Sequence, residues 1–171
     1  ATNFQVVPEL DLGIVVLTNG APVGLPEAVT ASFLELVEFG DLSRDWISDY
    51  QGAFGSMIVP VGDLVDVERP TSPAPAPSDA QILGDYTNEY FGTVRVERDG
   101  EDLVVRLGVD LDVVIVLEEW DGATFAYSPR SESAPFGSRA SAAFALGEDG
   151  QAATLRLASF DDRGLGSFTR K

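Results

Sequence analysis

The chain has 171 residues, a formal net charge of −17 at pH 7, no cysteine and no histidine. Such an acidic surface repels nucleic-acid phosphates and anionic membranes, so we expect neither as a partner. The lack of cysteine excludes disulfides and thiolate ligands, and no apolar run approaches the roughly 20 residues of a membrane span. No metal-ligand or cofactor motif is present, so we expect no metal and no cofactor.

Residues 4–20 predict a β-hairpin with a turn at Pro8. Proline fixes its own backbone and favours an extended Val7, so the first strand should end there. The apolar run 14–17 favours a strand buried on both faces, and it stops at a turn signal in 18–20. Because chain termini usually lie at the periphery, a central strand this early indicates a piece of a longer protein.

Two helices and an extended stretch are expected next. The first helix opens at Gly24-Leu25-Pro26, carries apolar residues at helical spacing and ends at Gly40. Ser43 is predicted to cap a second helix that runs to about Ala53. Residues 57–68 fit no regular element. The alternating prolines of 69–78 predict an extended spacer between two unlike halves.

The second half predicts an all-β domain. Strand signals recur about every 8 to 12 residues between Gly84 and Arg170, and Asp99-Gly100 is a strong hairpin signal. About eight strands of this length favour a small closed antiparallel barrel. The expected organisation is therefore an α+β hairpin-and-helix region at 1–68, a proline-rich linker at 69–80 and a barrel at 81–171.

Two stretches resemble a known enzyme family. The run VVPELDLGIVVLTNGAPVGLPEAV (6–29) is similar to the end of the catalytic domain of serine hydrolases of the class C β-lactamase and penicillin-binding-protein type, peptidase family S12. The run LGDYTNEYFGTVRVERDGEDLVVRLG (83–108) is similar to the lipocalin-like domain appended to these enzymes. The resemblance implies the C-terminal part of a serine hydrolase, with an α+β remnant followed by a lipocalin-like barrel.

No catalytic residue of that family can be placed in this chain. Without histidine there is no Ser-His-Asp triad, and Lys171, the single lysine, has no serine three residues before it. The family's serine, lysine and tyrosine therefore cannot be carried over to this chain, and the resemblance implies that the nucleophile and the Lys-Thr-Gly-type strand motif lie upstream. We therefore predict no catalytic residue here.

Aromatic residues on the predicted strands are the candidate ligand-binding set, because they would either line or fill a barrel interior. This set consists of Tyr86, Trp120, Phe125, Tyr127 and Phe144. Four arginines on or beside strands could bind an anionic group if they pointed inward, and otherwise form surface ion pairs. They are Arg95, Arg106, Arg139 and Arg156.

Three functions are compatible with the sequence. The first is the non-catalytic C-terminal region of a β-lactamase-like hydrolase, whose barrel shapes the active-site entrance or mediates oligomer contacts. The second is a small-molecule-binding lipocalin-like module. The third is an acidic glycosidase using paired carboxylates such as Asp110 with Asp112, or Glu118 with Glu119. The expected partner is the upstream catalytic domain, and the exposed hairpin should pair with another copy or pack on the barrel.

Overall fold

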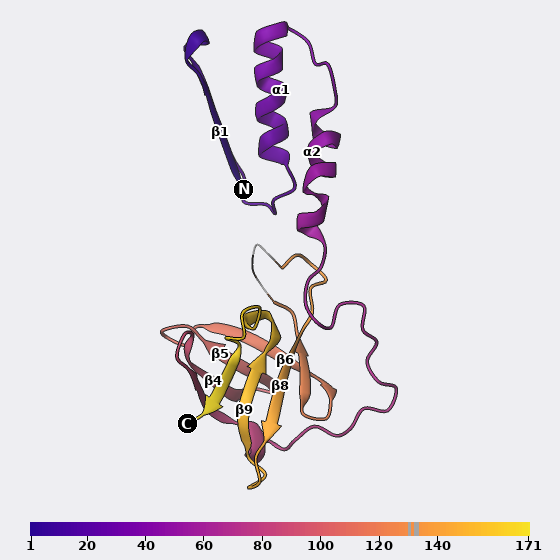
Figure 1. Ribbon diagram of the computed structural model, residues 1–171, viewed down its shortest axis with the longest axis vertical. Coiled ribbons are helices and arrows are strands. Elements are labelled where there is room, and N and C mark those ends of the chain that lie inside the picture. The colour runs from indigo at the N-terminus through magenta and orange to yellow at the C-terminus, as the bar shows by residue number, and fades with distance from the viewer. Residues whose placement is uncertain (130, 132–133) are drawn as a thin grey trace. The chain divides into compact units, whose positions relative to one another are not determined.

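The computed structural model describes residues 1–129, 131 and 134–171. The chain divides into two compact units, one made mainly of residues 1–59 and one that begins at Pro60. The first unit holds a two-stranded sheet and two helices, and the second holds a closed eight-stranded barrel (Figure 1). The predicted fold class is confirmed.

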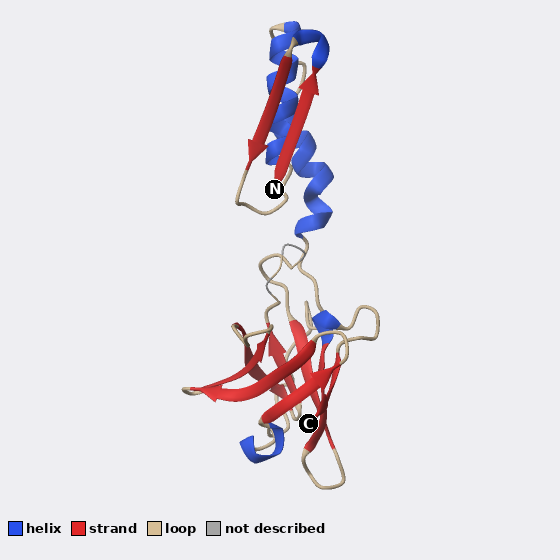
Figure 2. Ribbon diagram, turned by 90° about the vertical axis from the view of Figure 1, so that its left-hand side faces the viewer, coloured by secondary structure: helices blue, strands red, loops and turns tan. Residues whose placement is uncertain are grey.

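A β-hairpin forms one layer of the first unit, and helices form the other (Figure 2). Strands β1 (Thr2–Val7) and β2 (Leu12–Leu17) pair antiparallel, and the short 3-10 helix η1 (Pro8–Leu10) joins them. As predicted, the first strand ends at Val7. Asp11 closes η1 in the left-handed region with φ 50°, a conformation that aspartate tolerates better than most residues.

Strand β2 is buried on one face only. Ile14 and Val16 are half-buried, whereas Val15 and Leu17 are 65% and 72% exposed. The prediction of a strand buried on both faces is therefore wrong for this structure. The cause is the size of the sheet, because a hairpin with helices on one side leaves its other face in water.

The two helices of the first unit are α1 (Leu25–Phe39) and α2 (Trp46–Phe54), and the 3-10 helix η2 (Gly55–Ile58) follows. Gly24 precedes α1 with φ +80°, and a Cβ there would lie 2.8 Å from the Cβ of Tyr50. Asp45, not Ser43, caps α2, because its carboxylate accepts from the backbone amides of the first turn. The Ser43 hydroxyl donates instead to Glu35.

The barrel is an antiparallel meander that closes on itself. Its strands are β3 (Gly84–Asn88), β4 (Gly92–Asp99), β5 (Asp102–Leu107), β6 (Val113–Asp121), β7 (Thr124–Tyr127), β8 (Ala140–Leu146), β9 (Ala152–Leu157) and β10 (Ser167–Arg170). Strand β10 pairs with both β9 and β3, which closes the circle. The short helix α3 (Asp79–Ile82) leads into β3, and the 3-10 helix η3 (Ala158–Phe160) follows β9. Closure leaves no free sheet edge among the eight described strands of the barrel.

Residues 60–76 lie along the outside of the barrel, and we call this segment the strap. The Val61 amide donates to Ser138 Oγ at 3.0 Å, and its carbonyl accepts from the Arg139 amide at 3.1 Å. The Asp63 carboxylate accepts from both the amide and the hydroxyl of Ser141, at 2.8 and 2.6 Å. Farther along, the backbone of Ala74 bonds the β6–β7 turn.

Candidate functional site

Four of the five predicted ligand-binding aromatics lie in the barrel core. Tyr86, Phe125, Tyr127 and Phe144 are each at most 5% exposed and belong to one cluster of 16 buried residues. The Phe144 ring lies 6.0 Å from the Tyr86 ring and 5.6 Å from the Phe125 ring, both edge to face. These contacts fill the interior with side chains, which counts against the small-molecule-binding alternative.

Both core tyrosines use their hydroxyl groups within the protein. Tyr86 donates to the carbonyl of Ile82 at 2.7 Å, and its oxygen accepts from Arg170 at 2.8 Å. Tyr127 exchanges a hydrogen bond of 2.6 Å with Ser159 Oγ. Burial raises the pKa of both phenols, so both stay neutral at pH 7 and serve as structural hydrogen-bonding groups rather than as bases.

Trp120 lies in a different place from the other four aromatics. It packs with Leu64 of the strap and with Ala126 in a separate cluster. The register pairs Ala126 with Glu118, on the face opposite to that of the core residue Phe125, and a β-bulge follows Glu119. Trp120 therefore covers the outer wall of the barrel under the strap, and the expectation that it faces the interior does not hold.

The four arginines considered as anion binders form ion pairs with acidic side chains. Arg95 pairs with Asp85, Arg106 with Glu97 and Asp99, Arg139 with Glu118, and Arg156 with Asp161. Most of these side chains are substantially exposed, so most of the pairs contribute little to stability; Asp161, at 14% exposed, is the exception. The structure therefore supports surface ion pairs, and not anion binding inside the barrel, for these four arginines.

Two of the carboxylates considered for a glycosidase already have basic partners. Glu118 and Asp161 are engaged by arginines, and no group of three or more potential metal ligands occurs among the described residues. Asp161 also accepts from the Gly166 amide at 2.8 Å. The amide of Gly166 and the guanidinium of Arg156 both lower the pKa of Asp161, which is typical of a structural carboxylate.

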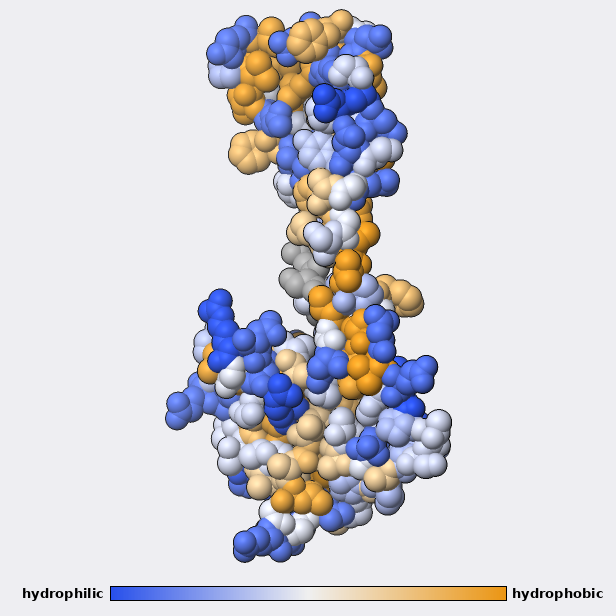
Figure 3. Space-filling view, turned by 45° about the vertical axis from the view of Figure 1, so that its right-hand side comes forward, coloured by the Kyte–Doolittle hydropathy of each residue, from blue (hydrophilic) through white to orange (hydrophobic). Residues whose placement is uncertain are grey.

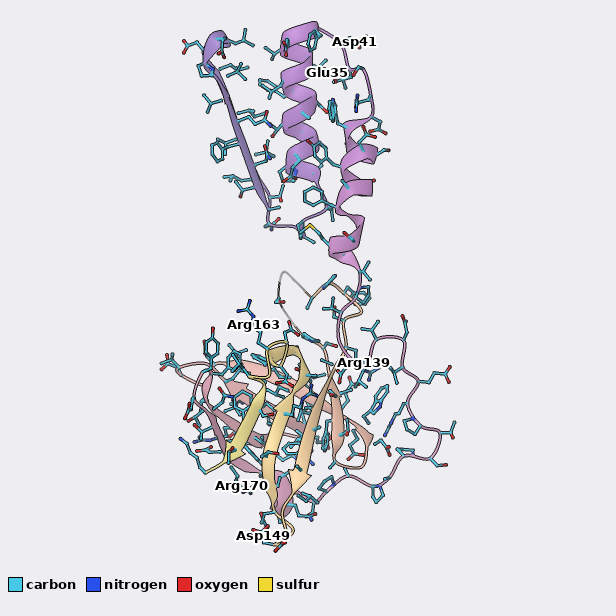
Figure 4. All side chains as sticks on the ribbon, viewed as in Figure 1. Glu35, Asp41, Arg139, Asp149, Arg163 and Arg170 are labelled. Atoms are coloured by element: carbon cyan, nitrogen blue, oxygen red, sulfur yellow. The ribbon has the colours of Figure 1, made fainter. Side chains whose placement is uncertain are left out.

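Sequence reasoning missed Arg170 (labelled in Figure 4), whose guanidinium donates to the hydroxyl of the buried Tyr86. Besides the Tyr86 hydroxyl, it donates to the carbonyl of Leu83 at 2.6 Å and to the side chain of Gln151 at 3.3 Å. It forms no ion pair with a carboxylate in the described part of the chain. Its partners come from residues far apart in the sequence, so no local pattern marks it.

The outward face of the hairpin is apolar, and we call it the open sheet face. Its residues share one side of the sheet by register: Thr2, Phe4, Val6, Gly13, Val15 and Leu17. The four large side chains among them are 65–72% exposed. Figure 3 shows such apolar side chains, in orange, at the surface of this unit. Monomeric proteins seldom leave contiguous apolar faces in water, so such a face indicates a contact surface.

A second apolar surface lies at one end of the barrel. The loops β3–β4, β5–β6 and β9–β10 open at the same end, because the strands alternate in direction. Each carries an exposed apolar residue: Tyr90 at 72%, Val109 at 101% and Leu165 at 39%. Leu111 in the β5–β6 loop has φ +55°, a strained conformation that in other proteins often marks functional loops. We call these residues the loop-tip surface.

Comparisons with known proteins assign the barrel to a protein family. Residues 68–167 match a family model described as a domain of unknown function, DUF3471. The chain belongs to this family. The barrel unit contains almost the whole matched range, so the family match describes the barrel and not the hairpin.

A solved structure agrees with this assignment. The crystal structure of the C-terminal domain of penicillin binding protein Rv0907 matches with 34% sequence identity and a TM-score of 0.52. The match covers 62% of this chain and 97% of that chain. No curated protein matches the sequence. Among the described residues, none of the helices has the length and apolar character needed to cross a membrane.

Proposed function

We propose that this chain is the non-catalytic C-terminal region of a longer β-lactamase-like serine hydrolase. Residues 1–59 would complete the sheet and helical layer of the catalytic domain, and the family barrel would be the appended domain. The likeness to a penicillin binding protein's C-terminal domain supports this proposal. The sequence also supports a non-catalytic role. It has no histidine and no Ser-x-x-Lys sequence, so it can form neither a Ser-His-Asp triad nor the nucleophile of β-lactamase-like serine hydrolases.

The open sheet face is the observation that carries the proposal. A two-stranded hairpin is at best marginally stable in water, and it usually needs further strands or a second packing layer. Here one face contacts α1, while Phe4, Val6, Val15 and Leu17 remain exposed on the other. Both outer edges of the hairpin are free among the described residues. A larger sheet with helices on its second face would bury all of these groups.

For the barrel, we propose that its loop end shapes the entrance to the catalytic site. The strap supports this role, because its hydrogen bonds to Ser138 and Arg139 fix the barrel's N-terminal attachment beside the loop that precedes β8. The loop-tip surface opens at that same end. A tethered domain has a high effective concentration near its attachment point, so weak apolar contacts suffice for docking.

Penicillin labelling of the natural gene product tests the proposal. The natural product is treated with a fluorescent penicillin, and its intact mass and labelled peptide are determined by mass spectrometry. We expect a product longer than 171 residues, labelled at a serine outside the present sequence, and no labelling of the 171-residue chain. A natural product of the same length as this chain, or a longer one that penicillin does not label, would refute the proposal.

A further inference from the structure

The loop-tip surface presents a tyrosine on a rigid turn. Tyr90 is 72% exposed in the turn between β3 and β4. The Oδ1 atom of Asn88 accepts from the backbone amides of Tyr90 and Phe91, at 2.7 and 3.0 Å, and holds the backbone of this turn. The side-chain amide of Asn88 also donates to the carbonyls of Leu165 and Ser167, both at 2.7 Å. One asparagine thus joins the β3–β4 turn to the β9–β10 loop.

Aromatic contacts support the exposed Tyr90 ring. The Phe91 ring lies 4.8 Å from the Tyr90 ring, edge to face. Phe91 in turn packs edge to face on Phe160 at 5.1 Å and lies 6.1 Å from the fully buried ring of Phe168. An exposed aromatic side chain that is held in this way loses little conformational freedom when it binds. Tyrosines of this kind often contribute a large part of the binding energy of an interface.

The three loops that form the loop-tip surface are acidic. Apart from Asp161, which pairs with Arg156, they contain four carboxylates that form no ion pair in the described part of the chain. These are Glu89, Asp110, Asp112 and Asp162. Arg163 is the single basic residue in the same three loops, and Figure 4 shows it at the loop end of the barrel, opposite Asp149. The exposed apolar loop tips therefore lie among negative charges.

This charge distinguishes between possible occupants of the loop-tip surface. A second copy of this chain carries a net charge of −17 and presents the same carboxylates, so electrostatic repulsion opposes its binding. A surface that combines arginine or lysine side chains with an apolar area would complement both the carboxylates and the apolar tips. Charge complementarity therefore favours a basic partner surface over a second copy.

We infer that the loop-tip surface docks on a basic surface of the preceding catalytic domain, with Tyr90 as the anchor. This inference rests on the proposed function, and it adds the chemistry of the surface that receives the barrel. An arginine on that surface can stack on the Tyr90 ring, and a second basic side chain can bind a neighbouring carboxylate. Because salt screens charges that are exposed to solvent, docking should weaken as the ionic strength rises.

Hydroxyl-radical footprinting of the natural product and of the 171-residue chain tests the inference. Tyr90 should be oxidised about threefold or more slowly in the natural product, because an anchor side chain is removed from water on docking. Leu146, which is 44% exposed at the opposite end of the barrel, should be oxidised equally in both forms. In about 1 M salt, where the Debye length is only about 3 Å, the protection of Tyr90 should decrease.

Matched charge changes test whether the partner surface is basic. E89K/D162K reverses two charges on the loop-tip surface, and E101K/E148K makes the same change in net charge at the opposite end of the barrel. In the natural product, E89K/D162K should remove the protection of Tyr90, whereas E101K/E148K should preserve it.

A second pair of variants tests Tyr90 as the anchor, with Leu165 as the side chain whose oxidation is followed. Leu165 is 39% exposed in the neighbouring loop, so it should also be protected in the natural product. Y90A should remove this protection, measured against the same variant of the 171-residue chain. Y90F keeps the aromatic ring and should preserve the protection.

Equal oxidation of Tyr90 in both forms of the protein would overturn the inference. Protection that neither salt nor E89K/D162K reduces would overturn it as well, because the partner surface would then not be basic. Penicillin labelling of the same samples separates this inference from the proposed function. A labelled product with an unprotected Tyr90 leaves the proposed function standing without this docking surface. A product that penicillin does not label, or that is no longer than this chain, refutes the proposed function and the inference with it.

Discussion

The guanidinium carbon of Arg170 lies 5.4 Å from the centre of the Tyr86 ring, and its Nη1 donates to the hydroxyl of that ring at 2.8 Å. The contact joins the last strand of the barrel to the first. Because β10 and β3 form only a short ladder, this side-chain pair reinforces the seam where the barrel closes. We expect this buried contact to stabilise the barrel more than the exposed ion pairs on its wall do.

Replacing Arg170 should destabilise the barrel more than replacing an exposed arginine. R170M removes the donor to Tyr86 and Leu83 and leaves their buried oxygens with fewer partners, so we expect a loss of about 2 kcal/mol in the free energy of unfolding. R95M, in an exposed pair with Asp85, should cost at most about 0.5–1 kcal/mol. Urea unfolding measures both. Equal losses would show that the seam does not depend on Arg170.

Adding a methyl group at Gly62 should detach the strap. A Cβ there would lie 2.1 Å from the carbonyl oxygen of Arg139, and φ is +125°. We expect G62A to cost about 3 kcal/mol or more and to raise the solvent exposure of Trp120, which red-shifts its fluorescence. Gly100 is the control, because it has a positive φ and no atom within 4 Å of its added Cβ. G100A should cost about 1 kcal/mol and leave the fluorescence unchanged.

Asp161 should make the barrel sensitive to acid. The Gly166 amide and Arg156 lower its folded-state pKa below the unfolded value. A lowered pKa gives stability that is present above the unfolded pKa of about 3.9 and is lost as the pH falls through the folded pKa. Melting temperatures between pH 6 and pH 2 should therefore fall less steeply for D161N than for the wild type. Parallel curves would exclude Asp161 as a source of this acid sensitivity.

Polar substitutions on the open sheet face should affect the two forms of the protein differently. F4Q and V15T change side chains that are 70% and 65% exposed, so the 171-residue chain should change by about 0.5 kcal/mol or less. It should also bind less of a dye that reports exposed apolar surface. In the longer product the same side chains would be buried, and melting should drop by several degrees. A similar small effect in both forms would show that the face stays in water.

The barrel could be predicted because its signals are local. Alternating residues such as Val94 and Val96, and turns such as Asp99-Gly100, act over a few positions, and the structure places them as expected. Trp120 was placed wrongly because a bulge after Glu119 interrupts the strand pairing. A strict alternation of inward and outward residues cannot reveal such an interruption.

The strap and Arg170 could not be predicted, for a different reason. Their partners are distant in sequence: Asp63 bonds Ser141, and Arg170 bonds the Leu83 carbonyl. The alternating prolines of 69–78 have the same composition whether they cross open solvent or lie along a barrel wall. Likewise, the apolar run of β2 predicts burial on both faces, whereas the two-stranded hairpin buries only one. A larger sheet, as in the proposed function, would cover the other face.

The strap also sets the N-terminal boundary of the shortest stable barrel. The family match begins at residue 68, yet the carboxylate that holds Ser141 and the leucine that covers Trp120 come from positions 63 and 64. A barrel cut at the family boundary would expose an indole ring and leave two donors of Ser141 unpaired. Truncated versions that start at Glu68 should therefore aggregate or melt at a lower temperature. Versions that start at Pro60 retain the contacts of Asp63 with Ser141 and of Leu64 with Trp120.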